Sequence, residues 1–412
     1  MSGPAPAPTG RNLAYHGFRT LPDLATGTAD GLRVDATGLL LARPTGSREY
    51  TDPHTGRTGR YEYASWTSPP VLTGFPVREV IPSWTADTPP GCWLEVELRG
   101  HDGTTGVTGW YVLGRWAGDD GTIHPTSVPG QQDDDGRVQT DVLVLAGTRD
   151  VPGWQVRVTL LRPTGSTGTP VLRSVGALAS GEHGGTAGTG GTSVAPTGPA
   201  DDAQTGPANG TVLDVPRFSQ RLHAGHHPQW GGGGDSWCSP TSVSMVLAWH
   251  GAGPVPEEYA WVDPADPRPV VDHAARHCFD HAYAGAGNWP FNTAYAGRYG
   301  MDAFVTRLRS LAEAEPFVAA GLPLVLSVAY AVGDVPGLDY DTRGHLLVLV
   351  GFTGDGDPVL NDPYAPDDAS VRRTVDRARF EHAWQVRASG GVTYVIRPPG
   401  VPLPPAPAQA NW

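Results

Sequence analysis

The chain lacks lysine altogether, so all 29 basic residues among its 412 are arginines. This absence excludes every chemistry that depends on a lysine amine, including a pyridoxal Schiff base, the lysine of a P-loop and a Ser-Lys dyad. Kinase and nucleotide-hydrolase functions are excluded with them.

Cysteine is also scarce, and the three present, Cys92, Cys238 and Cys278, do not form a disulfide framework. Cys92 and Cys278 lie in different predicted halves of the chain, so we expect no bridge between them and an ordinary buried Cys92. Residues 1–9 lack the basic and apolar regions of a signal peptide. This pattern indicates a cytoplasmic protein, or a secreted one if a leader is missing from the sequence.

Long apolar runs are absent as well. No stretch approaches 18 apolar residues, which predicts no membrane span. A net charge of −13 argues against nucleic acid or anionic membranes as partners, and a neutral or cationic substrate is more compatible with it. Abundant glycine (55) and proline (41), with 17% charged residues, favour loop-rich β structure.

Cys238 is the most informative residue that is present. It precedes apolar residues at helical spacing (Val243, Val246 and Leu247), and Pro240 suits a first helical turn. The cysteine is thus predicted at a helix N-terminus, where the helix dipole and unpaired N–H groups lower a thiol pKa from about 8.5. That position benefits a nucleophile and offers nothing to a structural cysteine.

The partners of a thiolate nucleophile follow downstream. His345 opens the apolar run 346–352, which predicts a buried strand, and a turn at 354–357 leads into a returning strand. The return would bring Asp362 beside His345, giving a thiol, a base and a group that orients the base. Because side chains alternate along a strand, Asn361 and Asp362 cannot both face the imidazole. We favour Asp362, because a carboxylate also stabilises the imidazolium that pairs with a thiolate.

An acyl-transfer site also requires donors for the oxyanion. The Cys238 backbone N–H is one donor, and Gln220 is the best side-chain candidate. Gln229 competes with it from the glycine-rich loop.

Several stretches together resemble the papain-like cysteine peptidases, and more narrowly the soluble bacterial relatives of the double-glycine leader peptidases that mature bacteriocins. They are Ser236 to Leu247, Gly287 to Ala296, Gly344 to Phe352 and Asn361-Asp362-Pro363. The resemblance extends over most of the chain, including Tyr15 to Ala177. It implies Cys238 as the nucleophile, His345 as the base, Asp362 as its orienting group and Gln220 in the oxyanion hole. No transporter segment follows, so leader export is not implied.

Composition divides the chain into two halves. Residues 11–178 carry short β-like runs and predict an all-β sandwich domain of the jelly-roll, galactose-binding-like type, suited to binding substrate or glycan. Residues 179–210 are rich in Gly, Thr and Pro and predict a flexible linker. Residues 211–398 predict an α+β papain-like peptidase domain that folds alone, and 399–412 a disordered tail. Helices are expected at 272–284 and 305–320, and strands at 322–330, 346–352, 359–362 and 392–397.

Other constellations carry competing interpretations. Six tryptophans in the first half indicate either a sandwich core or a carbohydrate platform. His273, His277 and His281 recur every four residues on a predicted helix, where a metal or a polar face would explain them. Acidic runs at 133–135 and 355–362 have loose calcium-loop spacing, and Ser236 follows Gly-Asp as in the GDS hydrolases. Trp237 and Trp289 would cover the helix or shape a cleft.

Together these features predict a cysteine peptidase that acts on peptide or protein substrates through a Cys-His-Asp triad and an acyl-enzyme, without metal or organic cofactor. Two alternatives stay open. One is a transamidase or amidase with the same residues, and the other is a non-catalytic protein that binds glycan or cell wall.

Overall fold

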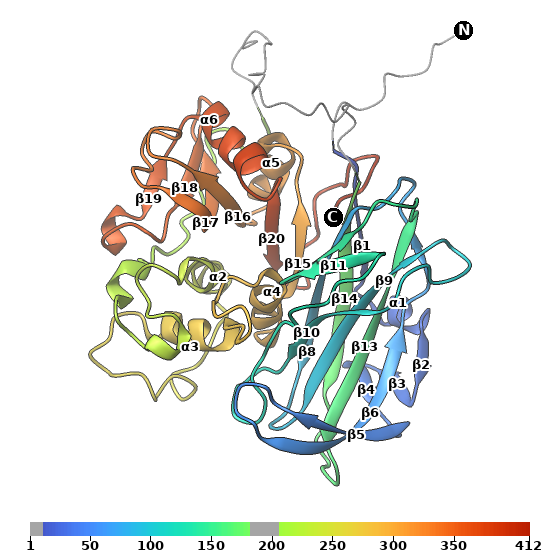
Figure 1. Cartoon of the computed structure of the whole chain (residues 1–412). Helices are drawn as coiled ribbons and strands as arrows, with labels where there is room; N and C mark the ends of the chain where they lie inside the picture. Colours follow the sequence, from blue (N-terminus) through green and yellow to red (C-terminus); the bar gives the residue numbers. More distant parts are fainter. Residues whose placement is uncertain (1–10, 182–205) are drawn as a thin grey trace, which may run out of the picture.

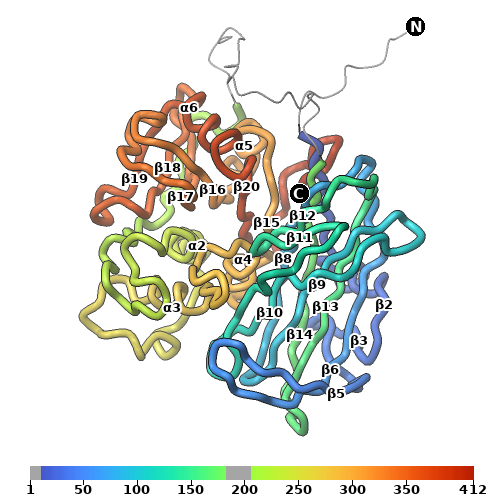
Figure 2. Tube along the Cα trace, in the orientation of Figure 1, coloured from blue at the N-terminus to red at the C-terminus, as the bar shows by residue number. Residues whose placement is uncertain are grey.

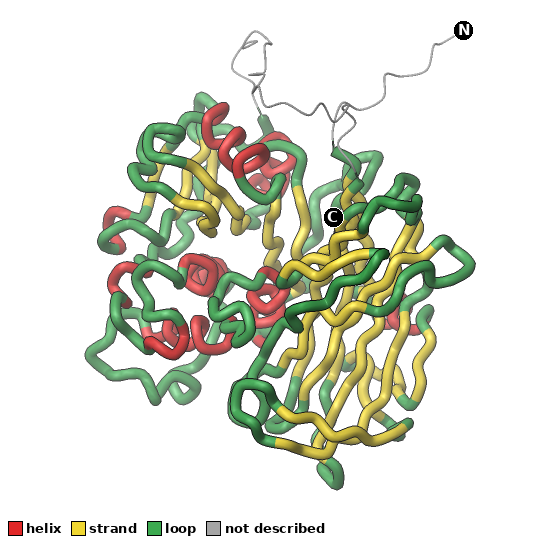
Figure 3. Tube along the Cα trace, in the orientation of Figure 1, coloured by secondary structure: helices red, strands yellow, loops and turns green. Residues whose placement is uncertain are grey.

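The computed structural model describes residues 11–181 and 206–412, arranged as a strand-rich N-terminal half beside a half that mixes helices and strands (Figures 1 and 3). No helix in the described residues is both long and apolar enough to cross a membrane.

The N-terminal half consists of two seven-stranded antiparallel sheets and one short helix, α1 (Leu21–Ala25). The first sheet contains β1 (Leu13–Phe18), β3 (Leu32–Asp35), β4 (Gly38–Leu41), β8 (Glu79–Asp87), β11 (Gly136–Gln139), β12 (Val142–Leu145) and β14 (Val171–Ser180). The second sheet contains β2 (Thr28–Asp30), β5 (Gly46–Thr51), β6 (Thr58–Thr67), β7 (Val71–Leu72), β9 (Trp93–His101), β10 (Tyr111–Trp116) and β13 (Gly153–Pro163).

Large aromatic side chains fill the core that these two sheets share. Trp84 from the first sheet packs in one cluster with Trp66 and Trp154 from the second, and each has no exposed surface. Trp116 belongs to the same cluster, whereas Trp93 is buried in a separate, smaller cluster with Tyr61 and Leu161. The sandwich-core interpretation is therefore confirmed for Trp66, Trp84, Trp116 and Trp154, and burial excludes a carbohydrate platform built from these five tryptophans. Cys92 is buried and free as predicted.

The C-terminal half is built on a six-stranded antiparallel sheet in the order β15-β20-β16-β17-β18-β19. Its strands are β15 (Asp302–Arg307), β16 (Leu324–Tyr330), β17 (Thr342–Phe352), β18 (Pro358–Asn361), β19 (Arg372–Thr374) and β20 (Val392–Arg397). Its helices are α2 (Cys238–Trp249), α3 (Pro269–Cys278), α4 (Trp289–Arg298), α5 (Leu311–Ala319) and α6 (Arg377–His382).

The apolar run in β17 reflects burial on both faces of this sheet. Leu346, Val348 and Val350 belong to the cluster around α2, whereas Leu347 and Leu349 belong to the cluster around α5. A strand covered on both sides has no solvent face and needs no polar alternation. Burial on both faces therefore places β17 in the interior of the C-terminal half, which also carries Cys238.

Two predicted helices differ from the structure. The segment 305–320 divides into strand β15 and helix α5, because residues 302–307 pair with β20 and the chain turns before Leu311. Helix α3 ends at Cys278 instead of reaching 284. There Asp280 accepts hydrogen bonds from the N–H groups of Ala282 and Tyr283, which closes a turn.

The halves share a buried interface. Phe291 and Ala294 of α4 lie in the core of the N-terminal half, and α4 and β15 both pack on β8 (Figure 1). Polar contacts reinforce the interface: Arg307 pairs with Glu79 at 2.5 Å, and Asp141 accepts a 2.8 Å hydrogen bond from the Trp289 N–H. This shared core argues against the expectation that the second half folds alone.

The predicted boundaries also need correction at both ends. Ala179 and Ser180 belong to β14, so the linker cannot begin at 179, and residues 182–205 of that linker lie outside the described residues. The tail 399–412 is ordered against the molecule instead of disordered. Asn411 is fully buried and donates to Arg307 O at 2.7 Å, and Ala410 O accepts from the Tyr15 N–H beside β1 (Figure 2). Apolar contacts add to these bonds, because Val401, Leu403 and Trp412 pack against the cluster around α5.

Candidate active site

Cys238 is the first residue of α2, as predicted, and its side chain is half-buried. The preceding Trp237 provides no side-chain cap, so N–H groups of the first turn are free to face an anion. The helix is fixed against the sheet where Ser242 Oγ donates to Leu346 O at 3.2 Å. The thiol therefore lies at the positive end of a helix packed on β17.

His345 lies on β17 and Asp362 follows the last residue of β18. The two strands pair in antiparallel register, with Val348 opposite Asn361, which returns Asp362 toward His345. His345 Nε2 lies 2.8 Å from Asp362 Oδ1, and both side chains are buried. The predicted meeting of these two residues is thus present in the structure. The remaining ring nitrogen, Nδ1, is the one available to Cys238.

Electrostatics couple the three groups. Burial by itself raises the pKa of the Cys238 thiol, but its hydrogen bond with His345 and the histidine charge lower that pKa below its ordinary value, helped by the Leu346 and Ser239 N–H groups. Burial disfavours the imidazolium, yet hydrogen bonds to Asp362 and Cys238 raise the pKa of His345 to about 10. Each group thus favours the charged form of the other, a thiolate at Cys238 beside an imidazolium at His345.

Asp362 has partners that keep it ionised and oriented. Burial raises the pKa of its carboxyl, but hydrogen bonds from His345, the Tyr364 N–H and the Tyr340 hydroxyl outweigh burial and lower it. The Tyr340 hydroxyl is 3.0 Å from Oδ1 and 3.1 Å from Oδ2. Sequence reasoning missed Tyr340, because its loop position carries no motif. Asn361 points away, donating to Val215 O and Pro216 O.

Gln220 is buried between the segment after β18 and the loop before Cys238. Its backbone N–H donates to Pro363 O at 2.8 Å, and its side-chain Nε2 donates to Gly234 O at 2.9 Å. Gln229, the competing candidate, is exposed. The segment leading to Gln220 forms an antiparallel bridge to β17, with Val212 opposite Gly351. A Cβ at Gly351 would lie 2.5 Å from Thr211 O, so a glycine allows this close approach.

A cleft of about 570 Å³ opens at Cys238. Its walls include Ser236, Tyr283 and Trp289, while Trp237 is fully buried beneath α2. Trp289 therefore shapes the cleft and Trp237 covers the helix.

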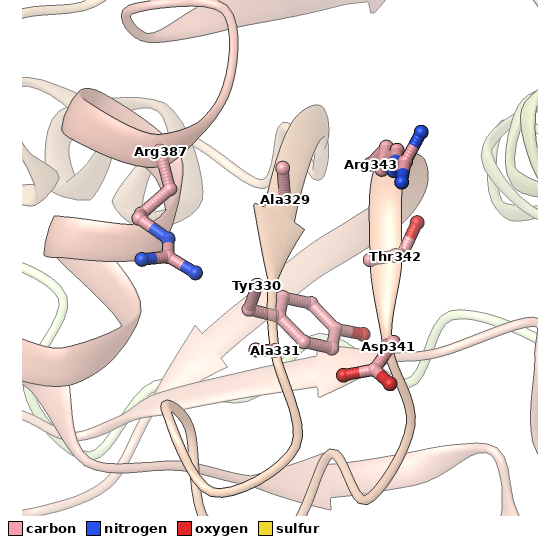
Figure 4. A pocket seen from close by; sticks show the side chains of 7 residues that line it. All are labelled: Ala329, Tyr330, Ala331, Asp341, Thr342, Arg343 and Arg387. Carbon is pink, nitrogen blue, oxygen red and sulfur yellow. The ribbon is translucent and has the colours of Figure 1, made fainter.

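A second cavity, of about 550 Å³, adjoins the first through two shared arginines, Arg343 and Arg387. Figure 4 shows these two side chains on either side of the β16 end that carries Tyr330. Arg387 pairs with Asp334 at 3.0 Å. Asp341 also lines the second cavity, so charged groups of both signs surround the passage between the two cavities.

Other candidates from the sequence are engaged elsewhere. His273 Nδ1 bonds the Tyr295 hydroxyl at 2.9 Å, and His277 Nδ1 lies 3.0 Å from the Arg298 guanidinium, an arrangement that repels a metal ion. The Ser236 hydroxyl donates to Gly231 O at 2.6 Å. Asp133 accepts hydrogen bonds from Tyr111 and nearby N–H groups.

Among residues 11–181 and 206–412, two overlapping groups could hold a metal ion, and both include Asp272. One adds His223 and His226, and the other adds His227 and Asp266. Sequence reasoning missed them, although the close spacing of the three histidines over 223–227 was a usable signal. Their partner Asp272 is distant in sequence and met them only through folding.

Comparison with known proteins matches two family models. Residues 14–180 match the peptidase C39 N-terminal domain, and residues 212–392 match the Peptidase C39 like family. No curated protein matches the chain. A solved C39-like peptidase from Bacillus anthracis is 19% identical, with a TM-score of 0.29, over 45% of this chain and 97% of that one. The enzymatically active domain of bacteriophage CBA120 tailspike protein 4 is 11% identical, with a TM-score of 0.17, over 40% of this chain and 19% of that one.

The two models between them span nearly all of the described residues, and the second contains Cys238, His345 and Asp362. The chain therefore carries a C39-like peptidase domain over residues 212–392, preceded by a C39 N-terminal domain over residues 14–180.

Proposed function

We propose that this protein is a cysteine peptidase that hydrolyses amide bonds through Cys238, His345 and Asp362. The Cys238 thiolate attacks the amide carbonyl, and the His345 imidazolium protonates the leaving amine. Neutral His345 then takes a proton from water, the hydroxide displaces the acyl group, and the thiolate is regenerated. Asp362 orients the imidazole and stabilises its charged form.

The observation that carries this proposal is the 2.8 Å contact between His345 Nε2 and Asp362 Oδ1, which directs the other ring nitrogen toward the thiol at the start of α2. A helix bearing the thiol, packed on an antiparallel sheet bearing His and Asp, is the papain-like arrangement. The two antiparallel sheets of the N-terminal half are compatible with the jelly-roll, galactose-binding-like type. This match is less specific than the papain-like match of the C-terminal half. Peptidase family membership favours peptide or protein substrates.

Gln220 and the Cys238 N–H are the proposed oxyanion donors. Gln220 is fully buried and fixed through Pro363 to the segment that carries Asp362. Its Nε2 has a second proton beyond the one given to Gly234 O, and that proton is free for a developing oxyanion. Loss of one such donor typically costs about 10² to 10³ in rate.

Digestion of a peptide library tests the function. We expect cleavage by the wild-type chain, with the Cys238→Ala chain as blank, and product termini consistent with water as acceptor. A second reaction containing a primary amine separates the alternatives: amine-capped products identify a transamidase. A thiol that reacts with a covalent probe while no peptide is cleaved would contradict the peptidase proposal.

Asp362 and its neighbour Asn361 form a matched pair for mutation. Asp362→Asn should lower kcat by about 10² to 10⁴, because the imidazolium loses its charged partner. Asn361→Ala should leave kcat nearly unchanged and lower the melting temperature, since Asn361 bonds backbone carbonyls and Arg372 instead of His345. Steady-state kinetics and thermal melts measure both. Equal losses of kcat would move the orienting role to Asn361.

The pKa shifts predict the pH dependence of thiol labelling. Because His345 lowers the pKa of Cys238, the midpoint of alkylation in wild type should lie below the ordinary thiol pKa of about 8.5. In His345→Ala the midpoint should rise, since burial remains and the lowering partner is gone. Hydrolysis should also decline near pH 10, where His345 loses its proton.

The other two thiols do not interfere, because both are buried and burial raises the pKa of Cys92 to about 11 and that of Cys278 far above its ordinary value. A labelling midpoint that is the same in wild type and His345→Ala would refute the ion pair.

A further inference from the structure

A cluster of three histidines and two aspartates lies outside the Cys-His-Asp site. It consists of His223, His226, His227, Asp266 and Asp272, and we refer to it as the 223–272 cluster. His223 ends the 3₁₀ turn Gln220–His223, the next two histidines follow in the loop, and Asp272 comes from the first turn of α3. The 3₁₀ turn, the loop that follows it and α3 therefore meet at the Asp272 carboxylate.

The donor atoms approach one another closely. His223 Nδ1 lies 2.9 Å from Asp272 Oδ2, and His226 Nδ1 lies 2.9 Å from Asp272 Oδ1. Ligands held at 2.0–2.2 Å around one tetrahedral ion stand roughly 3.3 Å apart, as expected from zinc bond lengths. A small shift of the three side chains would therefore place the two imidazole nitrogens and the Asp272 carboxylate around one ion.

Several buried polar atoms of this cluster make no aligned hydrogen bond to any residue that the structure describes. The side chains of His223 and Asp272 are both 0% exposed. Neither ring nitrogen of His223 makes an aligned hydrogen bond within the described residues, and neither does Asp272 Oδ2, despite their short contact. Leaving one such group unsatisfied costs about 1–3 kcal/mol, so native proteins rarely do so without compensation. A cation bound between Nδ1 and Oδ2 would satisfy both atoms together.

We propose that His223, His226 and Asp272 bind one divalent transition-metal ion, for which zinc is best suited. Imidazole nitrogens with a carboxylate are typical zinc ligands, and this set is neither all oxygen, as calcium and magnesium prefer, nor sulfur-rich. His226 Nε2 lies 3.5 Å from Asp266 Oδ1, the outer carboxylate that orients a metal-bound imidazole. His227 Nε2 lies 3.7 Å from Asp272 Oδ1 and its side chain is 22% exposed, so a water molecule could reach the ion from this side as a fourth ligand.

The position of the cluster defines the role of the ion. It lies in the segment that joins Gln220 to Cys238, and the His223 ring contacts the ring of Trp237, with 5.8 Å between centroids. Trp237 precedes Cys238 and donates its indole N–H to Trp230 O at 2.7 Å. A metal ion would tether this segment to α3. Its function is to stabilise the loop before the thiol, and no step of the hydrolysis passes through it.

The test uses the full chain carrying Cys238→Ala, so that the thiol cannot act as a ligand. After treatment with chelator and its removal, Zn²⁺ is titrated by calorimetry, and Co²⁺ is added to a second sample to record visible absorption. We expect one ion per chain, a higher melting temperature with Zn²⁺, and a Co²⁺ spectrum of low coordination number with nitrogen ligands.

Variants in the same background locate the ion. Asp266→Asn, which removes an outer partner, should weaken Zn²⁺ about 10- to 100-fold, and His223→Gln should weaken it further. His382→Gln, an exposed histidine on α6, is the matched control and should bind like the parent. If His223→Gln fails to fold, His226→Gln replaces it, because that side chain is 19% exposed. A chain that takes up no Zn²⁺, or uptake unchanged in these ligand variants, would overturn the proposal.

Discussion

Replacing Cys238 by alanine is expected to lower kcat/KM on a cleavable peptide by about 10⁴ to 10⁶, which leaves only the contribution of binding and oxyanion donors. The loss is this large because the thiolate forms the covalent bond, and no other group in the cleft can replace it. The Ser236 hydroxyl also lines the cleft, but it donates to backbone carbonyls and has no base beside it.

Cys238→Ser is the sharper form of this experiment. It keeps the size of the side chain and a hydroxyl in place of the thiol, but a serine lacks the depressed pKa that the ion pair gives to Cys238. We expect a loss nearly as large as that of alanine, with an unchanged thermal melt. Turnover at the wild-type rate in either variant would show that Cys238 is not the nucleophile.

Expressing residues 206–412 alone should yield insoluble or unfolded protein. Phe291 would lose its burial in the N-terminal core, worth about 1.5–3 kcal/mol. Arg307, only 5% exposed, would lose Glu79 and Ser180 as hydrogen-bond partners. The apolar surface of α4 and β15 that packs on β8 would also be exposed to water, which favours aggregation.

A matched experiment separates the interface from the covalent link. A specific protease site inserted between residues 182 and 205 is cut in the folded full chain, and size-exclusion chromatography follows the pieces. We expect the two cut pieces to elute together and the Cys238 thiol to stay reactive. Fragment 206–412 expressed alone should instead be insoluble or unfolded, without a reactive thiol. Co-expression with residues 1–181 should restore a folded fragment 206–412 with a reactive Cys238 thiol. A monomeric fragment 206–412 that melts like the full chain would contradict the importance of the interface.

Local patterns predicted the elements that carry the candidate site. The start of α2 at Cys238 follows from Pro240 and the apolar spacing after it, and both are properties of neighbouring residues. The approach of Asp362 to His345 follows from one short turn between two strands, because such a turn leaves few alternatives of register.

Contacts between segments that are distant along the chain could not be predicted from the sequence. Residues 302–307 form a strand because β20, some 90 residues later, pairs with them, and nothing local distinguishes that run from a helix. The hydrogen bond by which Asp141 caps α4 at the Trp289 N–H could not be predicted, because it forms only when the N-terminal half packs against α4. Asp272 likewise meets His223 and His226 only once α3 packs against the loop. Each of these features is decided by tertiary packing.

The hydrogen bond between Tyr15 N–H and Ala410 O has a consequence for biosynthesis. Strand β1 leaves the ribosome well before the segment that contains Ala410, yet its outer edge is bonded by that residue, which is made 395 positions later. Until then that edge presents unpaired N–H and C=O groups, which are a template for pairing with other chains. The N-terminal sheets can form early, but their open edge should make a nascent chain dependent on chaperones that shield exposed strands.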